Sequence, residues 1–330
     1  MKYVNLLITL LLCYNFVLAS NQKYNITVSK DATGNFKTVQ EAINSVTDNQ
    51  SARTVIFIKN GTYKEKVILP SSKINVSLIG ESVEHTIITF DDYNPKVKGT
   101  DTISTFNSFT FAADAEGFIA ENITFENSAG RVGQAVALRV NADKVIFRNC
   151  RFLGNQDTLF AHGIGRVYFS NCYIEGTTDF IFGSAIAVFE NCTLRSKHDS
   201  YITAASTPNG NPYGYVFKNC TLIADTGVHK VYLGRPWRAY AKTVFIHCNL
   251  GAHIRPEGWD NWRSPEREKT AYYAEYQNTG PGANFTTRVA WSWQLTDKEA
   301  SAYTVENIFA RNSVPIPVGK WNPNENKEVK

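Results

Sequence analysis

Two aspartates occupy the same place in consecutive copies of a short repeat. Asp157 and Asp179 each stand seven residues after a cysteine, Cys150 and Cys172. Two carboxyl groups held close together cannot both ionise freely, so one keeps its proton while the other becomes a charged nucleophile or base. The pair therefore predicts nucleophilic or acid–base catalysis. A solvated or metal-bound acidic ladder without catalytic use is the alternative interpretation.

Two glutamines accompany these acids. A 22-residue step aligns three segments without a gap: Gln134-Ala-Val-Ala-Leu138, Gln156-Asp-Thr-Leu-Phe160 and Thr178-Asp-Phe-Ile-Phe182. One column of this alignment holds Gln134, Gln156 and Thr178, and the next holds the two aspartates. A single buried glutamine is usually a satisfied core amide. Two amides beside a carboxylate pair are better explained as hydrogen-bond donors to a developing oxyanion.

A later segment adds an arginine and a tryptophan at a turn constrained by Gly and Pro, Tyr232-Leu-Gly-Arg-Pro-Trp237. Arg235 is a candidate to hold one aspartate ionised through a two-bond contact, and Trp237 offers a face for stacking on a sugar. A surface loop that packs on the scaffold is the alternative. Asp199 also stands seven residues after a cysteine, Cys192, but it lacks a preceding glutamine and ranks below the other two acids.

The scaffold that must position these residues is visible in the cysteine neighbourhoods. They read VIFRNCRFLG, VYFSNCYIEG, AVFENCTLRS, YVFKNCTLIA and TVFIHCNLGA, with cysteines at positions 150, 172, 192, 220 and 248. Each copy alternates apolar and polar residues, which is typical of a half-buried strand. One strand every 20 to 28 residues indicates a solenoid. Because no helical period connects the copies, a parallel β-helix is favoured over strand-and-helix repeats.

Like positions in successive coils of such a fold stack about 4.8 Å apart. Asp157 should then lie about 5 Å from Asp179. The five cysteines should form an inward column of small core residues, although disulfides between neighbours are a competing possibility. The asparagines before them, Asn149, Asn171, Asn191 and Asn219, are expected to form a ladder at a turn.

The chain has eight Asn-x-Ser/Thr sequons, and some glycosylation is expected if the protein is secreted. They lie at Asn25, Asn49, Asn60, Asn75, Asn122, Asn191, Asn219 and Asn284. Asn191 and Asn219 are doubtful acceptors because they belong to the expected ladder.

The two ends of the chain differ from the repeats. Residues 1–19 combine Lys2 with an apolar run and small residues, which predicts a signal peptide; a membrane anchor is the alternative. Thr38 and Glu41 form a capping box ahead of an amphipathic helix expected to plug the solenoid. Residues 20–313 are interpreted as one catalytic domain, and 314–330 as a tail rich in Pro, Asn and charge.

The net charge of +4 over 330 residues is too small to imply a nucleic-acid partner.

Five strings in order resemble the pectin methylesterase family, and the resemblance runs from about Val28 to about Ala310. They are Gly61-Thr-Tyr-Lys-Glu65, Gln134-Ala-Val-Ala-Leu138, Gln156-Asp-Thr-Leu159, Asp179-Phe-Ile-Phe-Gly183 and Leu233-Gly-Arg-Pro-Trp237. The resemblance implies an all-β, single-domain, right-handed parallel β-helix with an N-terminal capping helix. It also implies hydrolysis of galacturonate methyl esters in pectin without a cofactor or a metal.

The resemblance further implies roles for individual residues. Asp179 would be the nucleophile and Asp157 the proton donor and acceptor. Gln134 and Gln156 would stabilise the oxyanion, and Arg235 would orient Asp179. Substrate contacts would come from Thr105, Gln134, Arg235, Trp237, Phe182 and Tyr232.

The expected setting is that of a secreted cell-wall enzyme. The partners would be pectin and, as a candidate, a proteinaceous pectinesterase inhibitor, with the enzyme itself a monomer and no membrane association.

Two departures from the family pattern stand out. The family domain follows the signal peptide almost at once, so no inhibitor-like pro-region is expected. Thr203-Ala-Ala-Ser-Thr207 replaces a common Thr-Ala-Gln-Gly-Arg, which affects sugar contacts rather than ester chemistry.

Two other functions compete with this one. A glycoside hydrolase on the same fold could use two acids about 5 Å apart, but an oxocarbenium transition state gains little from oxyanion donors. A catalytically inactive pectin-binding wall protein is the third interpretation.

Overall fold

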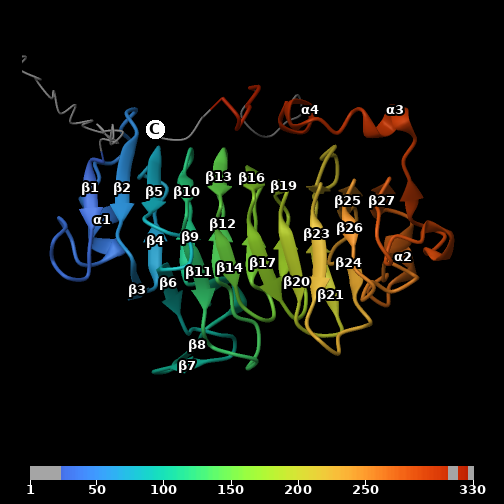
Figure 1. Cartoon of the computed structure of the whole chain (residues 1–330), viewed down its shortest axis with the longest axis horizontal. Helices are drawn as coiled ribbons and strands as arrows, with labels where there is room; N and C mark the ends of the chain where they lie inside the picture. The colour runs from blue at the N-terminus through green and yellow to red at the C-terminus, as the bar shows by residue number, and fades with distance from the viewer. Residues whose placement is uncertain (1–23, 311–318, 326–330) are drawn as a thin grey trace, which may run out of the picture.

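The computed structural model describes residues 24–310 and 319–325, and the predicted signal peptide lies outside them (Figure 1). The chain winds through successive coils, most of which add one strand to each of three long parallel sheets. The sheets surround one continuous apolar interior. This is the parallel β-helix that the repeat predicted.

The three sheets are called A, B and C here, and their strands have the following bounds. Sheet A contains β1 (Ile26–Val28), β2 (Thr54–Ile58), β5 (Val76–Gly80), β10 (Ile119–Glu121), β13 (Val145–Arg148), β16 (Arg166–Ser170), β19 (Ile186–Glu190), β22 (Tyr215–Lys218), β25 (Lys242–Ile246), β27 (Tyr272–Tyr276) and β28 (Trp293–Gln294). Sheet B contains β3 (Gly61–Lys64), β6 (Thr86–Phe90), β11 (Thr124–Asn127), β14 (Arg151–Leu153), β17 (Tyr173–Gly176), β20 (Thr193–Ser196), β23 (Thr221–Ala224) and β26 (Asn249–Leu250). Sheet C contains β4 (Val67–Leu69), β9 (Phe111–Ala113), β12 (Leu138–Val140), β15 (Leu159–Ala161), β18 (Ile181–Gly183), β21 (Tyr201–Ala205) and β24 (Tyr232–Pro236).

The remaining elements are short. A hairpin of β7 (Val97–Lys98) and β8 (Asp101–Thr102) projects from the coil. The helices are α1 (Val39–Ser45), α2 (Pro265–Glu268), α3 (Asp297–Ala300) and α4 (Val305–Phe309), with 3₁₀ turns η1 (Thr105–Asn107) and η2 (Phe285–Thr287).

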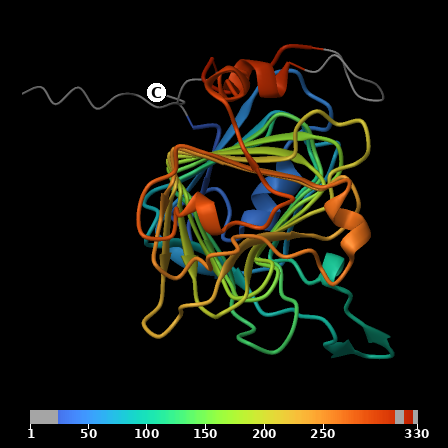
Figure 2. The same cartoon turned by 90° about the vertical axis from the view of Figure 1, so that its right-hand side faces the viewer.

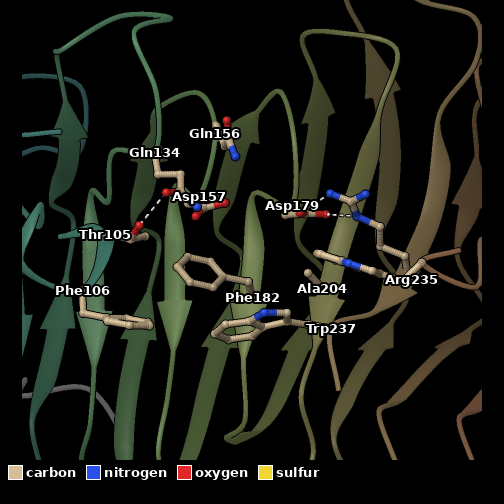
Figure 3. A pocket seen from close by; sticks show the side chains of 11 residues that line it. Thr105, Phe106, Gln134, Gln156, Asp157, Asp179, Phe182, Ala204, Arg235 and Trp237 are labelled. Atoms are coloured by element: carbon tan, nitrogen blue, oxygen red, sulfur yellow. Dashed lines mark hydrogen bonds and ion pairs between the residues drawn. The ribbon is translucent and has the colours of Figure 1, made fainter. Parts of the chain in front are cut away.

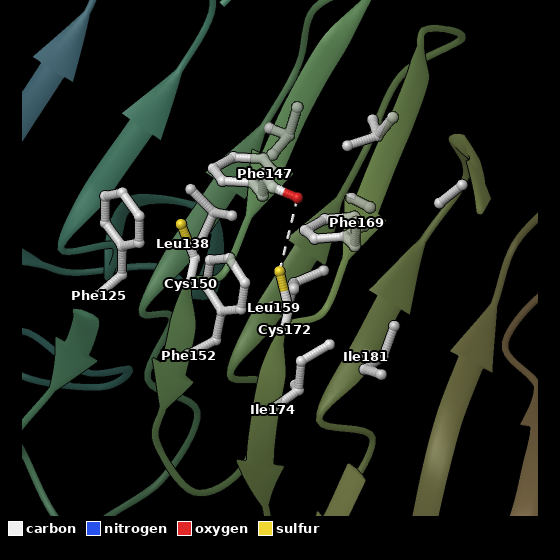
Figure 4. Close-up of a cluster of buried hydrophobic side chains, with 14 of the residues drawn as sticks. Phe125, Leu138, Phe147, Cys150, Phe152, Leu159, Phe169, Cys172, Ile174 and Ile181 are labelled. Atoms are coloured by element: carbon white, nitrogen blue, oxygen red, sulfur yellow. Dashed lines mark hydrogen bonds between the residues drawn. The ribbon is translucent and has the colours of Figure 1, made fainter. Parts of the chain in front are cut away.

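The cysteine column is confirmed. Cys150, Cys172, Cys192, Cys220 and Cys248 are all buried and all free, so no disulfide joins neighbouring coils. Figure 4 shows Cys150 and Cys172 pointing into the interior among phenylalanine rings. One phenylalanine per coil stacks on the next, with Phe147 and Phe169 ring centroids 5.0 Å apart. The repeat therefore sets both a thiol column and an aromatic column in the core.

The predicted asparagine turn is confirmed, but the ladder of side chains is confirmed only in part, because Asn171 Nδ2 donates to Ser170 Oγ at 3.1 Å. Asn149, Asn171, Asn191 and Asn219 all have φ between 47° and 55°. Asparagine adopts this left-handed conformation more readily than most residues, because its short polar side chain hydrogen-bonds locally. Asn149 Nδ2 donates to Asn122 Oδ1 of the preceding coil at 2.7 Å. The turn between sheets A and B is thus repeated at one sequence position.

Helix α1 closes the N-terminal end of the coil, as expected (Figure 2). Thr38 Oγ1 accepts from the Glu41 backbone N–H, and Val39 and Ile43 are fully buried. The first two N–H groups of the helix, those of Val39 and Gln40, donate to the Glu65 carboxylate. A residue from the β3–β4 connection therefore completes the cap.

The C-terminal segment packs on the outer face of sheet A, above the coils in Figures 1 and 2. Helix α4 buries Ile308 and Phe309 there, and the ring of Trp321, in the predicted tail, packs at a tilt against that of Phe309. The buried Arg166 guanidinium donates to the Phe309 and Gly319 carbonyls. Arg166 thus ties this segment to the coil.

The gapless 22-residue alignment is wrong in its first segment. Gln134 pairs with Gln156 as aligned, but Leu138 pairs with Leu159 instead of Phe160. The N–H groups of Ala137 and Leu138 both point to the Thr158 carbonyl, so the earlier coil accommodates one extra residue there. The alignment between the second and third segments holds, since Phe160 pairs with Phe182.

Candidate active site

The two aspartates lie at equivalent points of neighbouring coils, just before β15 and β18. The Asp157 N–H donates to the Thr178 carbonyl, and the Asp179 N–H donates to the Tyr201 carbonyl. Both residues are left-handed, with φ of 66° and 49°. Aspartate tolerates this conformation better than most residues, which explains why the chain can turn sharply at this position. The column does place Asp157 beside Asp179, as the repeat predicted (Figure 3).

Burial makes the two carboxyl groups unlike ordinary aspartates. Burial raises the pKa of Asp157 well above its usual range, and the neighbouring charge of Asp179 raises it further. A hydrogen bond from Gln134 and the charge of Arg235 offset only part of this rise in the pKa. Asp157 is therefore the acid of the pair that keeps its proton.

Arg235, from β24, favours the charged form of Asp179. Burial raises the pKa of Asp179, but the hydrogen bonds and charge of Arg235 act in the opposite direction. Arg235 Nε donates to Asp179 Oδ1 at 3.0 Å, and Nη2 donates to Oδ2 at 2.7 Å. The guanidinium lies between two rings, 3.8 Å from the Tyr201 centroid and 3.7 Å from that of Trp262. This contact orients a charged carboxylate toward the cavity.

The two glutamines flank the acids. Gln134 and Gln156 form a parallel bridge between their coils, and both line the cavity that contains Asp157 and Asp179. Gln134 Oε1 accepts hydrogen bonds from Thr105 Oγ1 and from Asn94 Nδ2, each at 2.7 Å. The other end of the Gln134 amide faces Asp157 (Figure 3). Amide donors thus border the carboxyl pair.

Aromatic side chains form the apolar part of the cavity, whose volume is about 180 Å³. Phe182 stacks on Phe160 with centroids 4.4 Å apart and meets the Trp237 ring edge-on at 6.0 Å. Phe106 and Trp262 complete this surface. An apolar surface beside two carboxyls suits a ligand with both ring faces and ester groups.

The structure brings most of the predicted site residues together. Thr105, Gln134, Gln156, Asp157, Asp179, Phe182, Arg235 and Trp237 all line the same cavity.

Two of the candidates lie outside that cavity. Tyr232 stacks on Tyr201, and the Arg255 guanidinium covers its ring at 4.7 Å. Asp199 is exposed, and its carboxylate accepts from the His229 and Lys230 N–H groups. Tyr201, not Asp199, follows Asp179 in the column.

Sequence reasoning missed four neighbours of the site: Asn94, Phe106, Tyr201 and Trp262. Asn94, Phe106 and Trp262 stand at no repeat position, whereas Tyr201 lies one 22-residue step after Asp179 and could have been found by extending the alignment. Phe106 also has a usable signal, because it follows Thr105 directly.

Among residues 24–310 and 319–325, no three His, Cys, Asp or Glu side chains gather closely enough to hold a metal ion. Within the same ranges, no helix has the length and apolar character needed to cross a bilayer.

Comparison with known proteins agrees with the geometry. The Pectinesterase family model matches residues 25–312. Pectinesterase 31 of Arabidopsis thaliana is 41% identical over 285 residues, which cover 84% of this chain and 90% of the relative. Pectinesterase/pectinesterase inhibitor 18 of the same plant is 38% identical over 301 residues, or 86% of this chain and 53% of the relative. The chain thus spans about half the length of the relatives whose names combine pectinesterase with pectinesterase inhibitor.

Solved structures share the fold over nearly their whole length. A pectin methylesterase from carrot is 36% identical, covers 90% of this chain and 98% of its own, and has a TM-score of 0.82. Pectin methylesterase PemA from Erwinia chrysanthemi is 31% identical, covers 89% of this chain and 99% of its own, and has a TM-score of 0.78. The family match, the relatives and the shared coil together establish that this chain belongs to the pectinesterase family.

Proposed function

We propose that this protein hydrolyses the methyl esters of galacturonate in pectin, releasing methanol and leaving free carboxylates. One observation supports this function above the others: an aspartate held by arginine, Asp179, lies beside an aspartate that keeps its proton, Asp157. Amide donors border both acids. A nucleophile, an acid and oxyanion donors are the three groups that acyl transfer from an ester requires.

In the first step, an Asp179 carboxylate oxygen attacks the ester carbonyl carbon. The carbonyl oxygen becomes an oxyanion, which the amide N–H groups of Gln134 and Gln156 stabilise. A glutamine carries two side-chain N–H donors, so Gln134 can contact Asp157 and the oxyanion together. When the C–OCH₃ bond breaks, Asp157 transfers its proton to the departing methoxy oxygen, and methanol leaves. The product of this step is an acyl–Asp179 anhydride.

In the second step, Asp157 is ionised and acts as a base. It removes a proton from water while the water oxygen attacks the acyl carbon. The anhydride bond then breaks, which regenerates charged Asp179 and frees the galacturonic acid, whose remaining water-derived proton passes to solvent. Asp157 again holds a proton. Each step transfers an acyl group and protons without oxidation or reduction. These residues and water therefore complete the cycle.

Substrate recognition is assigned to the walls of the cavity. Trp237 and Phe182 would stack on or support a sugar ring, and Thr105 and Arg235 would contact its polar groups. A related pectin methylesterase has been solved in complex with a hexasaccharide, at 30% identity and a TM-score of 0.77. Tyr232 is retained as a more peripheral contact, through its stacking on Tyr201.

The location, the domain boundaries and the partners of the protein follow from the same proposal. Residues 1–19 would direct secretion to the cell wall, residues 20–313 would form the catalytic domain, and 314–330 would be its tail. The enzyme would act as a glycosylated monomer on methyl-esterified homogalacturonan. A proteinaceous pectinesterase inhibitor is a candidate partner, because many relatives carry such a name alongside pectinesterase.

The test measures two products from one reaction. Purified protein lacking residues 1–19 is incubated with methyl-esterified pectin, and methanol and new reducing ends are quantified in parallel. We expect methanol without reducing ends. Reducing ends without methanol would identify a glycoside hydrolase and contradict the proposal, whereas neither product would indicate a binding protein.

The matched variant is Asp179→Asn, because asparagine also tolerates the left-handed backbone at this position. It should abolish methanol release while thermal unfolding shows an intact fold. Wild-type turnover in this variant would rule out Asp179 as the nucleophile.

A further inference from the structure

Asn94 lies between β6 and β7 and reaches back to the candidate active site. Its Nδ2 donates to Gln134 Oε1 at 2.7 Å and to Thr105 Oγ1 at 3.0 Å. Thr105 Oγ1 in turn donates its hydrogen to Gln134 Oε1 at 2.7 Å. The backbone N–H of Asn94 donates to the Gln134 carbonyl at 2.8 Å. The two residues are thus joined through both backbone and side chain.

These bonds decide which end of the Gln134 amide faces the acids. A glutamine side chain has an accepting oxygen and a donating nitrogen, and a rotation of about 180° exchanges them. Two donors converge on Oε1, so the oxygen end is satisfied on the Asn94 side. The donating end must then point toward Asp157. Without these two donors, either end of the amide could occupy that place.

The Asn94 segment is itself held rigidly. Asp92 is buried and forms ion pairs with Lys66 at 2.7 Å and with Lys96 at 3.2 Å. Gly133 lets the segment come close, because a Cβ on this glycine would lie 2.3 Å from the Asn94 carbonyl oxygen. Asn94 is therefore presented to Gln134 in one fixed position.

We propose that Asn94 is a positioning residue for ester hydrolysis, which together with Thr105 holds the Gln134 amide with its donor toward Asp157 and the incoming ester. This inference rests on the proposed function. Orientation in advance matters because an oxyanion donor that must first rotate loses much of its stabilising effect on the transition state.

Two substitutions separate orientation from simple loss of contact. Asn94→Ala removes the donor, and kcat should fall about tenfold, less than the hundredfold or more that follows loss of a whole oxyanion donor. Asn94→Asp replaces the donor by an acceptor of the same shape, which attracts the Gln134 N–H groups and turns the amide round. We expect kcat of Asn94→Asp to fall further than that of Asn94→Ala, while KM changes little in both.

A double-mutant cycle tests whether Asn94 acts through Gln134. In a Gln134→Ala background, Asn94→Ala should lower kcat less than twofold, because the side chain that it positions is gone. An equal fall in both backgrounds would overturn the proposal. So would unchanged kcat for both Asn94 variants.

The matched control is Asp92→Asn, which weakens the ion pairs of the segment but keeps the Asn94 side chain. It should lower the unfolding temperature with a smaller change in kcat than Asn94→Asp. If the two variants lowered kcat equally, Asn94 would only anchor the segment and the inference would be wrong. Methanol release by the wild-type chain is measured first, because its absence would reject the proposed function and not this inference.

Discussion

Arg235 and Asp179 are joined by two parallel hydrogen bonds, and the arginine fork lies between the rings of Tyr201 and Trp262. This geometry needs a planar, delocalised cation. A lysine ammonium could neither make both bonds nor stack on two rings. The charge of Asp179 thus depends on a contact with a residue 56 positions away in the sequence.

Replacing Arg235 by lysine should shift the pH profile. Burial already raises the pKa of Asp179 and Arg235 opposes the rise, so a weaker contact raises the pKa further. The nearby Asp260 carboxylate acts in the same direction as burial. Because attack requires ionised Asp179, the acid limb of kcat/KM should move to higher pH. Its maximum should fall about tenfold or more.

The control for this prediction is Arg195→Lys, since Arg195 lies on sheet B and pairs with Asp225 on the surface. Its pH profile should match that of the wild type. An unmoved acid limb in the Arg235 variant would contradict the role assigned to that residue.

Asp157→Asn should raise the free energy of unfolding at neutral pH and lower the activity. The folded pKa of Asp157 lies above its unfolded value of about 3.9. The wild-type protein therefore loses stability as pH rises from about 4 through that folded pKa, whereas asparagine does not titrate. We expect the variant to have the larger free energy of unfolding at pH 7, and this advantage to shrink near pH 4. Urea unfolding at both pH values checks this expectation.

Activity of the same variant should fall at least a hundredfold, because general acid catalysis contributes about 10²- to 10⁴-fold. An Asp157→Asn protein that is less stable than wild type at pH 7 would show that the buried carboxyl is not costly to the fold.

Trp237→Ala should weaken substrate binding more than chemistry. Trp237 contributes an aromatic face to the cavity and contacts Phe182, but it makes no bond to either acid. Loss of a stacking ring costs about 0.5–1.5 kcal/mol, which corresponds to a rise in KM of about two- to tenfold. Steady-state kinetics on methylated pectin measure this, with exposed Trp293→Ala as the control that should leave KM unchanged. A pure loss of kcat would place Trp237 in the chemical step.

Asp143→Asn should destabilise the fold. Although burial raises the pKa of Asp143, the hydrogen bonds and charge of Arg166 outweigh it and hold the pKa below its usual value. Arg166 is 1% exposed, so removal of its partner leaves a buried charge and should cost about 3 kcal/mol or more. Stability from this pair is present above pH about 4 and is lost as pH falls further through the lower folded pKa.

The comparison for this pair is Glu116→Gln, which breaks an exposed pair with Lys144 and should cost less than about 1 kcal/mol. Denaturant unfolding of both variants at pH 7 tests the difference. Equal losses would mean that burial of Arg166 is unimportant.

The regular part of the molecule could be predicted from the sequence. The spacing of Cys150 and Cys172 matches the length of one coil, so residues equally far from each cysteine must stack. This spacing predicts Asp157 beside Asp179, and the same 22-residue step predicts Gln134 beside Gln156. The prediction erred where a coil accommodates an extra residue, as at Leu138, because a local bulge changes the register without changing the alternating pattern.

The irregular part was decided only by the tertiary structure. Asn94 and Trp262 reach the site from segments with no repeat position, and Tyr232 faces Tyr201 instead of the cavity. Such segments have no period that encodes where they lie. Their positions depend on ion pairs, ring contacts and close backbone approaches between residues far apart in the chain. The sequence by itself therefore determined the coil, its cysteine column and the pair of acids, whereas the orientation of the groups around those acids was decided by long-range packing.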